Sequence, residues 1–258
     1  MNVQTIARGD LMEVGAYSHI GKVRDTNEDA YYISDNDDLK LFIIADGMGG
    51  HNAGEVASHI AIDTIKDYIA EKIALYPMIS EDNIHNIIQE AIIHANQVIF
   101  TKSLKEMDYQ GMGTTLTVVL ILPEIYIGHV GDSRAYLYHN DKIRQITQDH
   151  SLVGELLRNG SITENEARIH PKRNIITRAL GTDHNIMVDL YKIEKNKDDI
   201  IILCTDGLSN LVDVEEIKDV IAQCPSIQDG CEHLVSLANE RGGYDNTTVV
   251  AIKIGHNE

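Results

Sequence analysis

Four aspartates of this chain stand where a short apolar run of strand character meets a turn. Each has a glycine, asparagine or serine beside it, and the four are Asp46, Asp132, Asp206 and Asp245. Carboxylates at strand ends sit on rigid elements, and they can meet only if the fold brings those ends together. Because gathered carboxylates repel one another, they need a positive partner. Hard divalent cations such as Mg²⁺ and Mn²⁺ prefer such oxygen ligands. The sequence therefore predicts a metal-dependent enzyme.

The composition limits the classes of partner. The chain has 258 residues, of which 43% are hydrophobic, and this suits a folded core. Its formal net charge is −18. A nucleic acid needs a basic surface, and an anionic membrane repels an acidic protein, so both are disfavoured as partners.

The cysteines indicate a reducing compartment, and the histidine spacing argues against a zinc site. The three cysteines show no CxxC spacing and indicate reduced thiols, as in the cytoplasm. The 12 histidines lack the HxxxH and HExxH patterns of zinc hydrolases. No segment is long and apolar enough to span a membrane. Residues 1–11 do not resemble a signal peptide, and we interpret them as an N-terminal extension without an assigned function.

No linker, repeat or low-complexity tract divides the sequence, which predicts a single domain over 12–258. Runs of strand character cover 13–19, 30–34, 39–45, 114–122, 125–131, 133–139, 142–145, 187–192, 200–205 and 247–254. Helical spacing covers 56–73, 82–99, 214–223 and 228–240, with shorter pieces at 152–158, 163–167 and 175–179. Clustered strands followed twice by a helix pair favour an α+β fold with helices on the outer faces of the sheets. The weakly patterned stretch 148–181 is interpreted as a flap beside the site.

Six motifs occur in a fixed order along the chain. They are Gly21-Lys22-Val23-Arg24-Asp25-Thr26-Asn27-Glu28-Asp29, Asp46-Gly47-Met48-Gly49-Gly50-His51, Gly111-Met112-Gly113-Thr114-Thr115, Gly131-Asp132-Ser133-Arg134, Thr205-Asp206-Gly207-Leu208 and Asp245-Asn246-Thr247-Thr248. Each alone is weak, because Asp-Gly is most often a turn. In this order, from about residue 12 to 254, they resemble the metal-dependent serine/threonine protein phosphatases of the PP2C type (the PPM family) in their bacterial single-domain form.

The resemblance implies a fold and an activity. It implies a central sandwich of two antiparallel β-sheets, flanked on both outer faces by antiparallel helix pairs, with a flap insertion. The implied activity is hydrolysis of phosphoserine and phosphothreonine in proteins by a water or hydroxide that bridges two Mn²⁺ or Mg²⁺ ions. The implied partners are phosphorylated proteins and a bacterial Ser/Thr kinase that the enzyme opposes. A monomer is expected on the same basis.

The resemblance also implies roles for individual residues. Asp46 would bridge the two ions, with the Gly47 carbonyl on the second, and Asp206 and Asp245 would complete the site of the first. Asp132, together with Asp206, would hold a third, weaker ion. Glu28 and Asp29 would hold metal-bound waters, and Arg24 would bind the substrate phosphate. An arginine fork matches phosphate in geometry and charge. From the residues alone, Asp132 could instead pair with Arg134, and Arg24 with Asp25 or Glu28.

One position departs from the pattern of many eukaryotic relatives, which carry a histidine after the Asp-Gly pair. Here that position is Met48, so the group that protonates the leaving oxygen stays open among His51, His129 and a metal-bound water. Two rival functions also remain. A catalytically silent relative would have lost metal ligands, and a nucleotide or sugar phosphatase would use the same centre without the long flap.

Overall fold

The computed structural model describes residues 12–34, 39–50, 53–75 and 80–255, and these residues form two antiparallel sheets. One sheet has the strand order β1-β11-β10-β7-β8. Its strands are β1 (Met12–His19), β11 (Thr247–Ile254), β10 (Ile200–Cys204), β7 (Arg134–His139) and β8 (Lys142–Gln145). The other has the order β2-β3-β5-β6-β9, with β4 paired to β3. Its strands are β2 (Asp29–Ile33), β3 (Lys40–Met48), β5 (Leu116–Ile121), β6 (Ile125–Val130), β9 (Asp189–Ile193) and β4 (Gly113–Thr114).

The alternation of side chains along β3 shows how the layers form. Leu41 and Ile43 pack with the apolar residues of the helices outside their sheet. Phe42 and Ile44 face the other way and pack against the opposite sheet, in a core that includes Val250. Successive side chains of a strand point to opposite faces, so a strand that is apolar throughout is buried on both sides. This pattern predicts a sheet between two apolar layers, as the structure has it.

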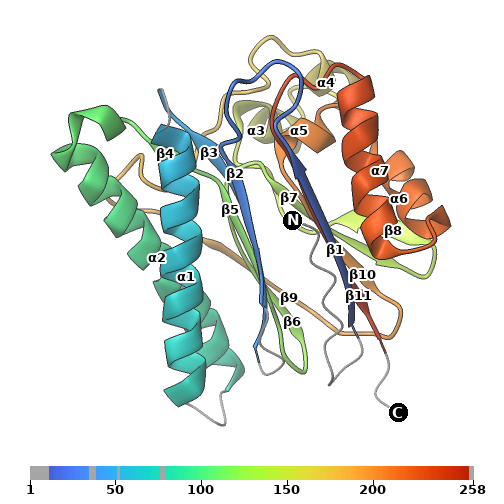
Figure 1. The fold of residues 1–258 in the computed structure, drawn as a ribbon, viewed down its shortest axis with the longest axis horizontal. Helices are drawn as coiled ribbons and strands as arrows, with labels where there is room; N and C mark the ends of the chain where they lie inside the picture. Colours follow the sequence, from blue (N-terminus) through green and yellow to red (C-terminus); the bar gives the residue numbers. More distant parts are fainter. Residues whose placement is uncertain (1–11, 35–38, 51–52, 76–79, 256–258) are drawn as a thin grey trace.

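Helix pairs cover the two outer faces (Figure 1). The first pair is α1 (Ala53–Leu75) and α2 (Glu81–Lys105), and it lies on the sheet that contains β3. The second is α6 (Val214–Gln223) and α7 (Ile227–Glu240), and α7 packs on β1 and β11. The predicted fold class is therefore confirmed as a sandwich of two antiparallel sheets between helix pairs. Among the described residues, no helix has the length and apolarity needed to cross a membrane.

A hairpin joins β7 and β8. Asn140 and Asp141 have positive φ angles of 49° and 59°, which is the backbone of a two-residue turn suited to twisted strands.

Segment 148–181 holds α3 (Leu152–Arg158) and α4 (Glu164–Arg168), at the end of the sandwich where α5 (Asp206–Ser209) also lies (Figure 1). The third short helix predicted here, over 175–179, is wrong. The Thr177 N–H donates to the His150 carbonyl and the Leu152 N–H to the Ile175 carbonyl, so this stretch runs extended beside the start of α3. Partners distant in sequence override a local helical spacing here.

Candidate active site

Asp46 lies on a central strand and faces a second acid. The sequence places it after a strand that ends at residue 45, but β3 continues through Met48, because β4 extends the pairing. In the register of β2 and β3, Asp46 is directly opposite Asp29. Its backbone is fixed by two hydroxyls: the Asp46 N–H donates to Thr115 Oγ1 at 3.0 Å, and Thr114 Oγ1 donates to the Asp46 carbonyl at 3.0 Å. These two hydroxyls therefore have a structural role.

Asp29, the first residue of β2, links its own sheet to the opposite sheet. Its Oδ2 accepts hydrogen bonds from Thr205 Oγ1 at 2.9 Å and from Thr248 Oγ1 at 2.7 Å. Both threonines sit at strand ends, Thr205 just after β10 and Thr248 near the start of β11. Asp29 is only 6% exposed, and its Oδ1 has no partner among the described residues. One oxygen of this buried carboxylate is therefore fixed, and the other is left for a further ligand.

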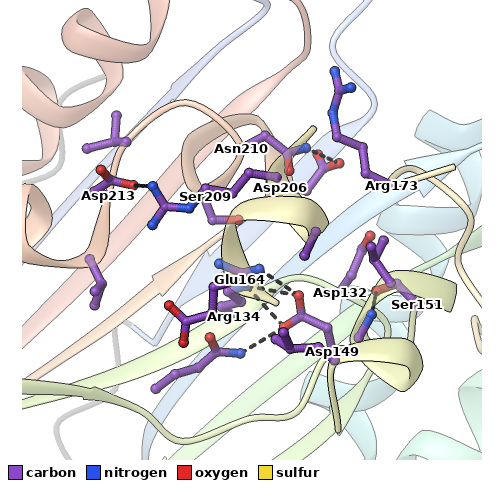
Figure 2. A pocket seen from close by; sticks show the side chains of 18 of the residues that line it. Asp132, Arg134, Asp149, Ser151, Glu164, Arg173, Asp206, Ser209, Asn210 and Asp213 are labelled. Carbon is purple, nitrogen blue, oxygen red and sulfur yellow. Dashed lines mark hydrogen bonds and ion pairs between the residues drawn. The ribbon is translucent and has the colours of Figure 1, made fainter. Parts of the chain in front are cut away.

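Asp206 is the first residue of α5, a helix that the sequence reading did not predict. Its Oδ2 accepts a hydrogen bond at 3.0 Å from Nδ2 of Asn210, the C-cap residue of this helix (Figure 2). The Asp206 and Asp46 carboxyl groups lie close enough for the charge of Asp206 to raise the pKa of Asp46. The ends of β3 and β10 thus bring these two acids together, as predicted.

Asp132 follows Gly131 in a turn that only glycine can make without strain. Gly131 has φ +115°, and a Cβ there would lie 2.5 Å from the Thr115 side chain. Asp132 is 6% exposed, and its Oδ1 has no partner among the described residues. The alternative pairing of Asp132 with Arg134 is wrong, because the Arg134 guanidinium binds both carboxylate oxygens of Asp149 at 2.7–3.1 Å (Figure 2).

Arg24 reaches the same centre. Its guanidinium donates to Asp245 Oδ2 at 2.7 Å, so neither alternative partner, Asp25 or Glu28, holds it by such a contact. The pKa of Arg24 is raised, first by this hydrogen bond and further by the charges of Asp245, Glu28 and Asp46. The guanidinium is therefore a half-exposed cation next to the carboxylates, at a place where an anionic substrate group could reach it.

Glu28 and Gly47 meet at the start of α1. The Gly47 N–H donates to the Glu28 carbonyl at 3.1 Å, and the Glu28 carboxylate accepts a hydrogen bond from the backbone of Gly54. A Cβ at Gly47 would lie 2.2 Å from the Gly54 carbonyl oxygen. Glycine is required here because backbone packs directly on backbone.

The electrostatics of the aspartates show how closely they gather. Burial raises the pKa of Asp46 well above its usual range, and the charges of Asp29, Asp206, Asp132 and Asp245 raise it further. Burial likewise raises the pKa of Asp29 to about 7, of Asp206 to about 6 and of Asp132 to about 8. Each carboxylate thus destabilises the ionised form of its neighbours, and a cation among them would relieve this repulsion.

These residues fit divalent cations. The donor set consists of carboxylates, which suit Mg²⁺ and Mn²⁺, and two buried carboxylate oxygens have no protein partner in the described part of the chain. Within the same residues, no three His, Cys, Asp or Glu side chains have the spacing of a complete metal-ligand set. Asp245 is ion-paired with Arg24, and the charges of Asp206 and Asp245 both raise the pKa of Asp46.

Sequence reasoning missed one residue that organises the site. Asn246 accepts a hydrogen bond from the Glu28 N–H at 2.8 Å, and its Nδ2 donates to the carbonyls of Ile20 and Thr26, both at 2.9 Å. It ties the loop that carries Arg24 to the start of β11. The only signal in the sequence is its place directly after Asp245.

Two further side chains, Cys204 and His129, are fully buried. Cys204 lies in β10, and burial raises its pKa to about 12, so it is a core residue. His129 is also fully buried and bonds Thr117 and the carbonyls of Gly131 and Gln148, which leaves it no access to a leaving group. His51 lies outside the described residues.

Comparison with known proteins agrees with this geometry. A family model described as protein phosphatase 2C matches residues 17–249. The serine/threonine phosphatase Stp of Listeria innocua is 39% identical over 235 residues, 90% of this chain and 92% of that protein. Protein phosphatase PhpP of Streptococcus pneumoniae is 34% identical over 262 residues, 96% of this chain and 99% of that protein.

Solved structures of similar proteins have the same fold. Stp1 from Staphylococcus aureus superposes with a TM-score of 0.86 and 34% identity, covering 99% of this chain and 100% of that one. The catalytic domain of PstP, solved in complex with two manganese ions, has a TM-score of 0.82 and 34% identity, with coverage of 95% and 99%. This chain belongs to the protein phosphatase 2C family and is a protein serine/threonine phosphatase.

Proposed function

We propose that this phosphatase needs two divalent cations, Mn²⁺ or Mg²⁺, held by Asp46, Asp206, Asp245 and the Gly47 carbonyl. The observation that carries the proposal is the group of aspartates at the strand ends, whose pKa values are raised by desolvation and by one another's charge. The PstP catalytic domain in complex with two manganese ions supports it. Two bound cations would neutralise the phosphoryl oxygens and make a water molecule acidic enough to attack phosphorus.

The chain's own residues would hold and orient the other reactants. The Arg24 guanidinium would donate two hydrogen bonds to phosphate oxygens, since its fork matches them in shape and charge. The buried Asp29 Oδ1 and the Glu28 carboxylate would accept hydrogen bonds from water molecules and so fix their orientation. Asp132, also with one unpartnered oxygen, would hold a weaker third ion together with Asp206.

We also propose that segment 148–181 acts as a flap over substrate within one domain, 12–258, and that the enzyme opposes a Ser/Thr kinase in the cytoplasm as a monomer. The three cysteines are free thiols, which fits a reducing compartment. Loss of label from an autophosphorylated Ser/Thr kinase on incubation with the enzyme would support the kinase relation. A kinase that kept its label would count against it.

Two substrates, a phosphothreonine peptide and a nucleotide, each tested with Mn²⁺ and with excess chelator, test the proposal. We expect rapid phosphate release from a phosphothreonine peptide in Mn²⁺ and none in chelator. Faster release from a nucleotide would favour a small-molecule phosphatase. Binding of the phosphopeptide without release would indicate a catalytically silent protein. Asp206→Asn is the matched variant, because it removes one ligand charge and keeps the shape of the side chain.

A further inference from the structure

A cavity of about 560 Å³ adjoins the carboxylate cluster (Figure 2). Asp132 and Asp206 line it at one side, and the rest of its wall comes from β7, β8, α3, α4 and the stretch from α5 to the start of α6. A phosphorylated residue bound at the carboxylates would therefore place the neighbouring residues of its own chain beside this cavity.

Two charged side chains that line the cavity, Arg134 and Asp149, neutralise each other and are held by hydrogen bonds. The Arg134 guanidinium is neutralised by the two oxygens of Asp149, and Gln145 Nε2 donates to the same carboxylate at 2.8 Å. Arg134 also donates to the Tyr136 hydroxyl at 3.2 Å. Arg134 therefore has its charge matched within the protein and is not the group that would attract a ligand.

Three further arginines line the cavity, Arg144, Arg168 and Arg173, and the first two come from different walls. Arg144 comes from the edge strand β8 and makes no side-chain hydrogen bond or ion pair with the described residues. Arg168, from α4, pairs with Asp213, but both side chains are more than half exposed, at 56% and 52%. An ion pair so exposed contributes little, and a ligand carboxylate could replace Asp213 at small cost.

The remaining lining includes the charged residues Glu164 and Arg173, but part of it fits the non-charged part of a peptide. Ile143, Val153, Leu157 and Val214 contribute apolar surface to the same cavity. A pocket with apolar walls and a few placed charges suits a side chain that has an aliphatic stem and a charged end. The chain has a formal net charge of −18, which repels an acidic peptide in general. Arginines in this cavity would offset that repulsion locally and so favour an acidic segment of the substrate.

We propose that this cavity recognises an acidic side chain, Asp or Glu, that the phosphoprotein substrate carries close to its phosphorylated residue, with Arg144 and Arg168 binding the carboxylate. The proposal rests on the proposed function, since it takes the phosphorylated residue to be held at the Asp46 and Asp206 centre. It defines the substrate class as acidic phosphosites.

Three phosphothreonine peptides that differ only in their flanking residues test this. The flanks carry Glu, Gln or Lys, and kcat/KM is measured with Mn²⁺ for the wild type, for the double variant Arg144→Gln/Arg168→Gln and for Lys105→Gln. Lys105, at the end of α2 on the outer helix pair, is the matched loss of a positive charge away from the cavity. We expect the wild type and Lys105→Gln to prefer the Glu peptide over the Gln peptide by roughly fivefold, the effect of about 1 kcal/mol.

In the double variant the preference should disappear, while kcat/KM for the Gln peptide stays at the wild-type value. Equal use of the Glu and Gln peptides by the wild type, or an undiminished preference in the double variant, would overturn the inference and leave the proposed function standing. Fluorescence anisotropy of the labelled peptides reports binding even if no peptide is hydrolysed. Tighter binding of the Glu peptide by the wild type than by the double variant then supports the acidic pocket, and equal binding refutes it.

Discussion

The buried His129 makes the stability of this protein depend on pH in a defined direction. Its Nε2 lies 3.0 Å from the Gly131 carbonyl and 3.2 Å from that of Gln148, so Nε2 carries the hydrogen. Its Nδ1 lies 3.0 Å from Thr117 Oγ1 and accepts from that hydroxyl. Burial, together with the neighbouring His150, lowers the pKa of His129 to about 4.

The sign and size of the effect follow from this pKa. The unfolded chain takes up a proton on this histidine near pH 6.5, and the folded protein does so only near pH 4. Between these values the unfolded state binds more protons, so the free energy of unfolding falls as the pH is lowered. The difference 6.5 − 4 is 2.5 pH units, and at 1.36 kcal/mol per unit it amounts to about 3 kcal/mol.

Urea unfolding between pH 7.5 and 4.5 measures this loss. We expect His129→Gln, which keeps polar atoms but does not titrate, to lose about 2–3 kcal/mol less than the wild type over that range. The exposed His59 on α1 gives the matched control, and His59→Gln should follow the wild type. If His129→Gln and the wild type lose stability in parallel, the assignment of His129 as a buried neutral group is refuted.

Three further changes probe the site. Arg24→Ala should lower kcat/KM for a phosphopeptide roughly tenfold or more and leave Mn²⁺ affinity nearly unchanged; a higher Mn²⁺ requirement with normal peptide use would contradict the phosphate-binding role. Thr248→Val removes a 2.7 Å hydrogen bond to the buried Asp29, so the free energy of unfolding in urea should fall by about 1.5–3 kcal/mol. In an Asp29→Asn background the same change should cost much less. Additive losses in the double variant would argue against this bond. Gly47→Ala should lower Tm, because overpacking typically costs about 1–3 kcal/mol, whereas Gly50→Ala has open space around it and should leave Tm unchanged. An equal Tm for both variants by calorimetry would show that the backbone around Gly47 can move to accommodate a methyl group.

Much of the fold could be predicted because the patterns are local. The runs at 200–205 and 247–254 are mostly apolar, and both became strands that are buried on two faces over most of their length. The exact end of β3 could not be predicted, because β4, a two-residue strand near residue 113, extends the pairing beyond Ala45. A two-residue partner leaves no periodic signal, and its effect depends on contacts distant in sequence.

The site could be predicted as a set of acids, but not as a network. The sequence indicates that Asp46 and Asp206 meet, and the structure places them close enough to interact electrostatically. It could not indicate that Arg24 pairs with Asp245, because that contact joins positions 221 residues apart. The threonine hydroxyls on Asp29 were missed for the same reason, since a strand threonine has the same sequence signal whether its hydroxyl faces solvent or a buried carboxylate.

The central claim is that the aspartates bind two divalent cations for catalysis. Isothermal titration of Mn²⁺ into the metal-free protein at pH 7.5, with phosphopeptide hydrolysis measured on the same samples, tests it most directly. We expect two ions per chain in the wild type and in Glu90→Gln, an acid-to-amide control on α2. Asp46→Asn and Asp206→Asn should lose tight binding and hydrolysis together. Two ions still bound by both Asn variants, or full hydrolysis by metal-free protein in chelator, would contradict it.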